Sequence, residues 1–325
     1  MLKNTMNKFL VLLLINLFAI SFAYSQDTLI QSREGCRILV AKKNYVKGMA
    51  FSWDGPCENG FANGKGTRKM FINDTLVSTY LGSLLRGSRE GMAVLKGEDG
   101  TSYEGEYKNN VREGKGTYTN SKTGDRYAGQ FKNDLNDGYG ELTLPGGDNY
   151  KGFFKNNEYE GKGVFIFADG EKQDGEFKAG DVNGEAKIIL RDGRILEGTF
   201  LNHQLHGKGT MTWPDGNKYV GEFYQGVFDG NGKLIFSNGG WYEGSFKNGH
   251  YYGKGKLHTP KGEEYEGDMF NGKLQGTGTY KYKDGSMYTG GWYNNKPQGY
   301  GEMTAGGKTW KGTWADGEKV AEARK

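Results

Sequence analysis

The sequence has little of the material from which a large globular enzyme is built. Its mean hydropathy of −0.76 is too low for one extensive hydrophobic core. Only two cysteines and four histidines occur among the 325 residues. A structural zinc site requires four ligands and a catalytic one at least three, and the closest pair, His203 and His206, has no other cysteine or histidine nearby. We therefore expect these two histidines to be solvated turn residues without a bound metal.

An excess of charge of one sign is also missing. Lysine and arginine number 43 and aspartate and glutamate 39, which gives a formal net charge of +4. A nucleic-acid partner would require a basic stripe, and an anionic membrane surface attracts clusters of about four to eight basic residues. The sequence contains neither feature. The charge therefore argues against nucleic acid as a partner and weakens the case for a lipid headgroup.

A long apolar run occurs only at the N-terminus. Lys3 and Lys8 precede the stretch 9–22, which is interrupted only by two polar residues, and the small residues Ala23 and Ser25 follow. Export signals place about 7 to 15 apolar residues before a small-residue cleavage site. We expect residues 1–25 to be a signal peptide and the protein to be periplasmic, exposed on the outer surface or secreted. An uncleaved anchor helix is the alternative.

The two cysteines, Cys36 and Cys57, are separated by about 20 residues in the part that would be exported. A disulfide closing a loop of this length is worth roughly 3 kcal/mol in an oxidising compartment. Two free buried thiols are the alternative. We expect the bridge to fix residues 26–52, with their apolar run at 38–41, as a cap over the first strand of the remaining chain.

Glycine is abundant and is placed beside aromatic residues. The chain has 56 glycines, yet 14% of its residues are aromatic, which is more than a disordered Gly-rich segment would contain. Twelve units begin with a residue followed by a glycine two positions later, the first residue is aromatic in ten of them, and from Tyr127 to Tyr288 every step is 23 residues. A second ring stands four residues after the first, and Gly-x-Gly pairs follow it. The positions that best define this period are Tyr103, Gly105, Tyr107, Gly114, Gly116, Tyr127, Gly129, Phe131, Tyr150, Gly152, Phe154, Tyr219, Gly221, Phe223, Gly230, Gly232, Tyr242, Gly244, Phe246, Tyr265, Gly267, Tyr288, Gly290 and Trp292.

This pattern, Y-x-G-x-F followed by G-x-G and a D-G turn, resembles the MORN repeat family over residues 53 to about 317. The segment 35–66, with a cysteine before the first unit, resembles the start of exported bacterial MORN proteins. The units at Gln173 and Leu196 lack the leading ring, and the last unit ends before its second strand. The resemblance implies a non-catalytic attachment protein with an array at 53–317 and a charged tail at 318–325.

Alternation of period two predicts the fold. Residues i, i+2 and i+4 of a strand share one face, so each unit reads as an amphipathic β-hairpin with its rings on one side. We expect an all-β, elongated array of stacked antiparallel hairpins that forms a single twisted sheet. In the unit at Tyr219 the expected register pairs Tyr219 with Leu234, Gly221 with Gly232 and Phe223 with Gly230. Rings would lie flat across the glycines, which leave the backbone bare for close approach.

No catalytic or cofactor motif is found. The loop 60–67 superficially resembles a phosphate-binding loop, but the glycine spacing is wrong and Gly66 separates Lys65 from Thr67. Acidic residues follow the first glycine in four of the units and share a face with recurring lysines. Cross-strand ion pairs explain them, and we expect no enzyme activity and no cofactor. The residues concerned are Glu106, Glu176, Glu222 and Asp268, with Lys115, Lys162, Lys208 and Lys254.

These observations favour an exported scaffold that attaches a protein partner, or a second copy of itself, along the repeats. Many weak equivalent contacts can add up to a useful affinity. The expected contact surface consists of rings on the outward positions, which are Tyr139, Tyr159, Tyr224, Tyr251 and Tyr300. The alternative is a module that binds glycan or a phospholipid headgroup at the membrane surface, because rows of rings can stack on sugars.

Overall fold

The protein consists of β-structure with one short 3-10 helix in the part of the chain that the computed structural model describes, residues 27–322. Twenty-four of the 28 strands in that part belong to one sheet of antiparallel hairpins. The expected all-β fold is therefore confirmed. The predicted signal peptide, residues 1–25, lies outside the described residues. Within residues 27–322 no helix has the length and apolar character needed to cross a membrane.

The described chain divides into two compact units. Unit 1 comprises residues 27–99 with Tyr107–Asn110, and unit 2 comprises Gly100–Glu106 with residues 111–322. Strand β9 (Thr101–Lys108) contributes to both. The remaining elements of unit 1 are β1 (Thr28–Gln31), β2 (Arg37–Val40), η2 (Lys42–Asn44), β3 (Met49–Trp53), β4 (Cys57–Glu58), β5 (Phe61–Ala62), β6 (Gly64–Ile72), β7 (Thr75–Leu85) and β8 (Ser88–Gly97).

Unit 1 holds a small sheet of four strands in the order β1-β2-β5-β4. A disulfide joins Cys36, beside β2, to Cys57 in β4. The N-terminal segment also bonds to β3, the first strand of the large sheet. The main-chain N–H of Arg33 donates to the carbonyl of Phe51 (2.9 Å), and the carboxylate of Glu34 accepts from the N–H of Trp53 (2.8 Å). Ile38 is fully buried. This segment therefore covers β3 as a cap would.

Unit 2 is built from hairpins in chain order, with strands mostly of seven or nine residues. Its strands are β10 (Val111–Asn120), β11 (Arg126–Lys132), β12 (Leu135–Thr143), β13 (Asn149–Lys155), β14 (Glu158–Ile166), β15 (Lys172–Lys178), β16 (Asp181–Ile189), β17 (Ile195–Leu201), β18 (Gln204–Thr212), β19 (Lys218–Tyr224), β20 (Val227–Ile235), β21 (Trp241–Lys247), β22 (His250–His258), β23 (Glu264–Phe270), β24 (Lys273–Lys281), β25 (Met287–Tyr293), β26 (Lys296–Ala305), β27 (Lys308–Ala315) and β28 (Glu318–Glu322).

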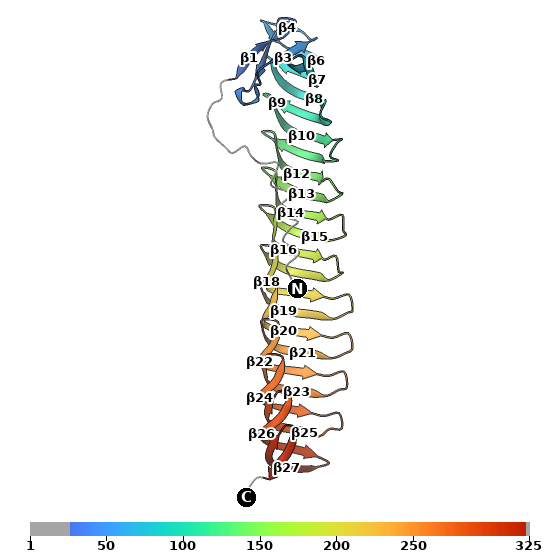
Figure 1. Cartoon of the computed structure of the whole chain (residues 1–325), viewed down its shortest axis with the longest axis vertical. Coiled ribbons are helices and arrows are strands. Elements are labelled where there is room, and N and C mark those ends of the chain that lie inside the picture. The colour runs from blue at the N-terminus through green and yellow to red at the C-terminus, as the bar shows by residue number, and fades with distance from the viewer. Residues whose placement is uncertain (1–26, 323–325) are drawn as a thin grey trace. The chain divides into compact units, whose positions relative to one another are not determined.

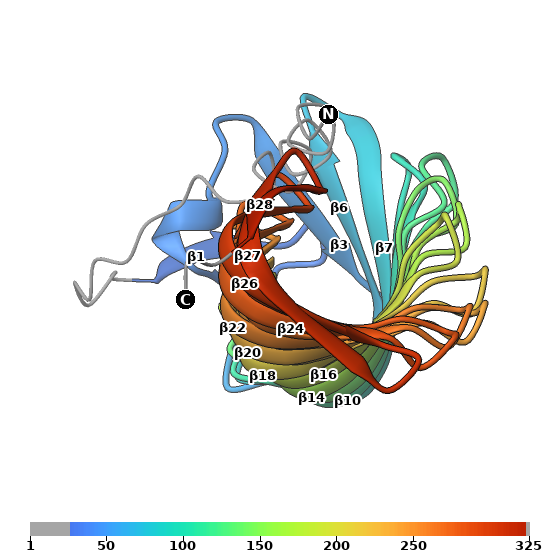
Figure 2. The ribbon, with the colours of Figure 1, turned by 90° about the horizontal axis from the view of Figure 1, so that it is seen from below.

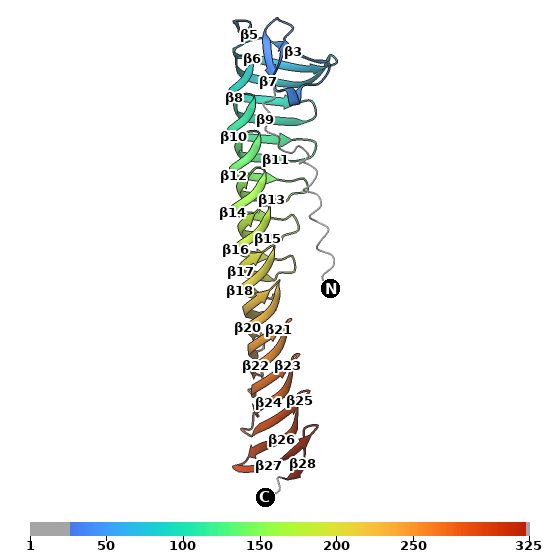
Figure 3. The ribbon, with the colours of Figure 1, turned by 90° about the vertical axis from the view of Figure 1, so that its left-hand side faces the viewer.

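Each strand from β11 to β27 pairs antiparallel with the strand before it and the strand after it. The hairpins of unit 2 consequently stack one after another in sequence order (Figure 1), and the same order is seen from the side (Figure 3). Viewed along the stack, these strands follow one curved profile (Figure 2). The predicted array of repeated hairpins is thus present in unit 2, including the unit at Gln173 that lacks a leading ring.

The predicted register is right in two pairs and wrong in the third. Tyr219 lies opposite Leu234 and Gly221 opposite Gly232, but Phe223 lies opposite Phe228, and Gly230 instead faces Phe246 of the next hairpin. The cause is a β-bulge between Gly221 and Phe223. One residue of β19 there lies opposite three residues of β20. The middle one of the three, Gly230, has a φ of 107°, a value that favours glycine. The same bulge recurs in the other hairpins of unit 2 from β11 to β26.

The C-terminal end also differs from the prediction. The last unit was expected to end before its second strand, leaving residues 318–325 as a charged tail. The structure instead forms β28 from Glu318–Glu322 and pairs it with β27. A turn at Asp316 and Gly317, both with positive φ, closes this hairpin. Backbone pairing does not require apolar side chains, so a charged segment can complete an edge hairpin.

The core of unit 2 is a continuous row of rings on one face of the hairpins. Tyr219 is fully buried, stacks on Phe228 at 3.8 Å between centroids, and makes edge contacts with Phe223 and with Phe246 of the next hairpin, both at 5.1 Å. The ring also covers Gly232, where a Cβ atom would lie 2.3 Å from the tyrosine hydroxyl. Glycine is therefore required for ring and backbone to lie this close.

Candidate functional site

The strands of unit 2 bend toward their rings, and this bend defines the outer face. In a straight strand residues four apart are separated by about 13 Å. The ring centroids of Tyr219 and Phe223 are only 5.1 Å apart, and the hydroxyl of Tyr219 reaches the carbonyl of Glu222 at 3.0 Å. Tyr127 with Phe131 and Tyr242 with Phe246 repeat this geometry. The rings therefore lean over the glycines on one face, and the opposite face of the same strands is the outer face.

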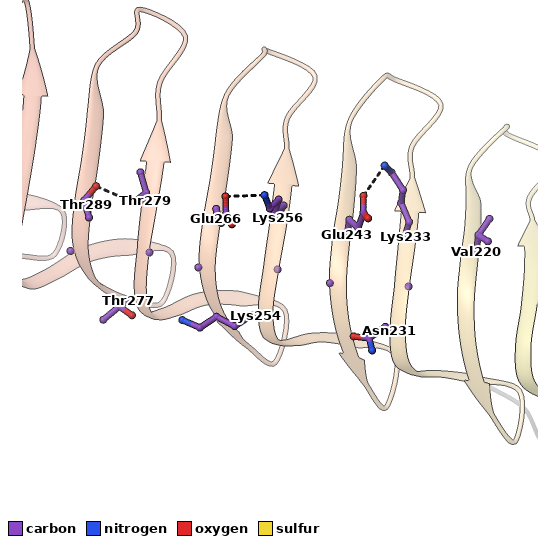
Figure 4. A pocket seen from close by; sticks show the side chains of 16 residues that line it. Val220, Asn231, Lys233, Glu243, Lys254, Lys256, Glu266, Thr277, Thr279 and Thr289 are labelled. Atoms are coloured by element: carbon purple, nitrogen blue, oxygen red, sulfur yellow. Dashed lines mark hydrogen bonds and ion pairs between the residues drawn. The ribbon is translucent and has the colours of Figure 1, made fainter.

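A shallow trough of about 1110 Å³ follows this line of glycines on the outer face of unit 2. Its floor is made by glycines such as Gly232, Gly255 and Gly278. One rim carries pairs of side chains from neighbouring hairpins, and the other carries Asn231, Lys254 and Thr277 (Figure 4). The paired rim consists of Lys233 with Glu243 (2.8 Å), Lys256 with Glu266 (3.1 Å) and Thr279 with Thr289 (3.0 Å).

The charges at the trough are already paired. Lys254 forms an ion pair with Asp268 at 2.7 Å. The hydrogen bond from Lys254 is the main reason that the pKa of Asp268 lies below its usual value, and the N–H of Thr277 adds to the effect. A general acid or base requires a pKa moved toward neutrality, and this shift goes the other way. The trough therefore presents neutral pairs and hydroxyls to a ligand and no poised catalytic group.

The acidic residues after the first glycine have a structural role that the sequence interpretation missed. The carboxylate of Glu222 accepts from the N–H of Asn231 at 3.2 Å, in the bulge of the same hairpin. Glu106 accepts from Lys115 in the same way, and Asp268 from Thr277. The expected cross-strand ion pair forms between Lys254 and Asp268. In these hairpins the acid also satisfies a backbone donor that the bulge leaves without a ladder partner.

The outer face of unit 2 also carries a row of exposed apolar side chains near the hairpin turns. We call it the outer row and define it as Leu201, Tyr224, Tyr252, Phe270 and Tyr293. Their exposed fractions lie between 44% and 56%. Leu201, Tyr224, Phe270 and Tyr293 occupy equivalent positions, one residue after the second-ring position of their units, which Met269 fills in the unit of Phe270. The ring of Tyr252 contacts Phe270 at 5.6 Å, so members of the row touch across hairpins.

The equivalent positions nearer the start of unit 2 are charged. Lys155 stands where Tyr224 and Phe270 stand later, and it forms an ion pair with Asp137 of the preceding hairpin at 3.1 Å. One such pair, Lys247 with Asp229 at 3.1 Å, interrupts the outer row. The backbone geometry is the same at both kinds of position, so the choice of side chain is not imposed by the fold.

Three of the five tyrosines expected on the contact surface are exposed. Tyr139, Tyr224 and Tyr300 have exposed fractions of 48%, 56% and 62%. The prediction was wrong for Tyr159 and Tyr251. Their rings stack on the inward rings Tyr150 (4.0 Å) and Tyr242 (3.8 Å), and Tyr159 is buried.

Simple alternation explains both errors. The bulge sets three residues against one and so leaves the parity of the strand unchanged, and both tyrosines share the inward parity of the Gly-x-Gly glycines of their strands. Tyr159 pairs with Phe154, and Tyr251 with Phe246. By the same rule Tyr252, next to Tyr251, points outward. Phe270 and Tyr293 were missed although they share the repeat position of Tyr224, which was the signal that could have identified them.

The histidines do not assemble a metal site. Within residues 27–322 no group of three or more histidine, cysteine, aspartate or glutamate side chains is placed to hold a metal ion. His203 lies in a turn, where its Nε2 accepts from the N–H of Val182 at 3.4 Å and its Nδ1 lies 3.3 Å from Asp181. Burial is the main cause that lowers its pKa. His206 lies in β18, not in the turn, and contacts Tyr224 at 5.3 Å between centroids.

Comparison with known proteins gives one clear finding. The family model described as MORN repeat matches residues 103–122, 127–149, 150–172, 197–218, 219–241, 242–264, 265–287 and 288–307, together more than half of the chain. Eight units are matched, fewer than the twelve read from the period, since degenerate units such as the one at Gln173 fall outside. No curated protein matches.

Among the solved structures that match the chain, one serves as an example. It is the TCP domain of SAS-4 (dCPAP) of Drosophila melanogaster, in complex with a proline-rich motif of Ana2 (dSTIL). Identity is 14%, the match covers 61% of this chain and 87% of that chain, and the TM-score is 0.23. With so low a TM-score, we draw no functional conclusion from the similarity.

Proposed function

The chain belongs to the MORN repeat family, and from this premise we propose that it is an exported, non-catalytic scaffold that binds a protein partner along the outer face of its hairpins. The observation that carries the proposal is the outer row, in which Leu201, Tyr224, Tyr252, Phe270 and Tyr293 are exposed on hairpins whose inward tyrosines are buried. Contiguous exposed apolar side chains on a soluble surface are typical of interaction sites.

The spacing of the outer row suits several contacts with one partner. Equivalent residues in successive units are separated by two strands, which is about 10 Å. Tyrosine and phenylalanine bring large contact area at a low cost in side-chain entropy. Contacts that are weak singly can add to a useful affinity when they are borne by one array. The trough is a poorer candidate for this role, because its charged side chains already bind one another.

Export to the cell envelope is part of the proposal and rests on the N-terminal sequence. Lys3, Lys8 and the apolar run 9–22 are typical of a signal peptide, and Ala23 and Ser25 suit the cleavage site. Fractionation of cells producing the full chain, with mass spectrometry of its N-terminus, tests this part. We expect an envelope or secreted protein that begins near residue 26. A cytoplasmic protein that retains residues 1–25 would contradict export.

The partner is tested by affinity capture from extracts of the producing cells. The test variant is Tyr224→Ser/Phe270→Ser/Tyr293→Ser, which removes three rings of the outer row. The matched control is Lys132→Ser/Lys155→Ser/Lys178→Ser, which changes the equivalent position of three earlier units. We expect a protein captured by the wild type and the control but reduced at least tenfold with the test variant, and direct binding of that protein after purification.

Sedimentation with liposomes and with insoluble glycans is measured in parallel with the affinity capture. It distinguishes the protein scaffold from the alternative of a glycan or headgroup module. If the test variant and the control capture the same proteins equally, the outer row is not the binding surface. If the wild type and the control capture no protein but still bind glycan or lipid, the scaffold proposal is wrong and the alternative stands.

A further inference from the structure

Unit 1 contains a buried arginine that has no counterion. Arg68 in β6 is only 7% exposed, and its guanidinium lies over the rings of Phe51 (5.0 Å) and Tyr80 (5.4 Å). Its Nε atom is buried without a hydrogen-bond partner. Burying a cation without an anionic partner is costly, and ring contacts offset only part of that cost.

A second arginine lies beside the first. The guanidinium of Arg89 stacks on Tyr107 at 4.5 Å, and its Nε is also buried without a partner. Asn110 holds this residue in place: its side-chain oxygen accepts from the N–H of Arg89 at 2.9 Å, and its carbonyl accepts from Nη2. Burial and, as the second cause, the nearby charge of Arg89 together lower the pKa of Arg68 to about 9. The two arginines are also linked by geometry, because Tyr80, which lies under Arg68, contacts Tyr107, which lies under Arg89, at 5.7 Å between ring centroids.

No acidic side chain that the structure describes neutralises this pair. Residues 1–26 and 323–325 contain no aspartate or glutamate, so every acidic side chain except that of Glu322 belongs to the described part. There, neither arginine forms an ion pair with a carboxylate, and no carboxylate contributes to the shifted pKa of Arg68. In each of the two guanidinium groups, only Nε is buried without a hydrogen-bond partner. The terminal nitrogens that make no hydrogen bond are therefore still in contact with solvent.

The equivalent arginine of the following repeat shows what is missing. Arg112 stacks on Phe131 at 4.8 Å, and its N–H and Nη2 bond to Asp134 as those of Arg89 bond to Asn110. Here the turn residue is an aspartate, whose Oδ1 accepts from Nε at 3.3 Å and neutralises the cation. At Arg89 the same position holds an amide. One repeat thus supplies its own carboxylate and the preceding one does not.

From this contrast we propose that Arg68 and Arg89 form an anion site in unit 1 that binds a small inorganic oxyanion such as phosphate or sulfate. The planar guanidinium presents paired N–H donors that match the oxygens of such an anion. Two guanidinium groups supply two positive charges for a divalent anion. The anion plays the part for Arg68 and Arg89 that Asp134 plays for Arg112. The site is independent of the outer row and of the scaffold function.

The test measures phosphate binding to the purified protein directly, by equilibrium dialysis with labelled phosphate. It also measures the melting temperature in phosphate against chloride at equal ionic strength. We expect one phosphate per wild-type chain and a rise of about 3 °C in Tm at ten times the Kd. Arg68→Met should lose both effects. Asn110→Asp, which supplies the carboxylate found at Asp134, should also lose phosphate binding. Arg126→Met, which removes an exposed arginine, should keep it.

The outcomes separate clearly. Binding of phosphate that is lost in Arg68→Met and in Asn110→Asp but kept in Arg126→Met supports the site. Equal phosphate binding by all four proteins, or an equal Tm rise in chloride, overturns it. If Arg68→Met fails to fold, Asn110→Asp alone decides, because retention of full phosphate binding in that variant contradicts the proposal. Capture experiments on the outer row are unaffected by either result.

Discussion

The two faces of the hairpins in unit 2 obey different rules. On the inward face a ring recurs at most equivalent positions, as with Tyr127, Tyr150, Tyr219 and Tyr242, all buried to at least 98%. On the outer face one equivalent position holds Lys155 in one unit and Phe270 in another. Because both faces belong to the same strands, the difference comes from what each side chain must touch. The inward face specifies the fold, and the outer face is available for function.

The two faces differ because an inward side chain contacts more neighbouring side chains than an outer one. An inward ring such as Tyr219 touches Phe223, Phe228 and Phe246 and covers Gly232, so a change of shape affects several neighbours at once. An outer side chain meets one neighbour across the hairpins, as Tyr252 meets Phe270. Changes of pH and single substitutions on either face can test this contrast, and the largest effect is expected at high pH.

Alkaline pH should unfold the inward face. Burial raises the pKa of Tyr80 and Tyr242 to about 12 from the ordinary value of 10.0. Between these values the folded form keeps a proton that the unfolded form has lost, so the free energy of unfolding falls as pH rises from 10 to 12. Below pH 10 the contribution is fully retained. Denaturant titrations at stepped pH should show this loss, and it should become less steep in Tyr242→Phe. An unchanged pH dependence in Tyr242→Phe would contradict the assignment.

Truncating one inward ring should lower the free energy of unfolding by nearly as much as alkaline pH. Tyr219→Ala is expected to cost about 3–5 kcal/mol, because the cavity is surrounded by rings that cannot collapse into it. Tyr224→Ala, on the outer face of the same strand, should change the free energy of unfolding by no more than about 0.5 kcal/mol. Denaturant melts of the two variants measure the contrast. Similar losses in both would mean that the two faces do not differ in this way.

Adding a side chain at the bend should have an intermediate effect. A Cβ on Gly232 would lie 2.3 Å from the hydroxyl of Tyr219. Gly232→Val is therefore expected to cost about 1–3 kcal/mol through overpacking. Lys233→Val, the adjacent outer position, is the control and should cost less than about 1 kcal/mol, since it removes an exposed ion pair with Glu243. Thermal melts that rank the two variants in the opposite order would refute the close contact.

The smallest effect on stability should come from the pair that interrupts the outer row. Lys247 and Asp229 are joined by an exposed ion pair, and Lys247→Leu should change the free energy of unfolding by about 0.5 kcal/mol or less. The same substitution makes the row continuous between Tyr224 and Phe270. We expect tighter capture of the protein partner, measured by titration with the purified partner. Weaker capture would place the binding surface elsewhere.

The sequence predicted the features that have a simple period. The spacing of 23 residues, the hairpins, the buried rings and the pairing of Tyr219 with Leu234 follow from alternation and are confirmed. The bulge could not be predicted in this way, because Gly230 and Gly232 alternate as in a regular strand. The exposure expected for Tyr159 and Tyr251 was wrong for another reason, because alternation itself places both on the inward parity of the Gly-x-Gly glycines.

Other features depend on single residues that do not recur at the repeat spacing. Asn110 and Asp134 occupy equivalent turns, and only their contacts with Arg89 and Arg112 show that one neutralises its arginine and the other does not. The strand at Glu318–Glu322 is formed by backbone pairing in a segment whose charges predict a tail. In both cases the deciding partner comes from a neighbouring hairpin, about 20 residues away or at the chain end.

The pairing of every strand from β11 to β27 only with its chain neighbours has a consequence for how such a molecule can change over evolutionary time. Duplicating or deleting one unit inserts or removes a segment whose ends match whatever stands on either side, so no distant contact has to be rebuilt. The length of unit 2 can thus grow or shrink in steps of about 10 Å. The number of units therefore sets the distances between docking points along the array, and these distances can change only in steps of one whole repeat.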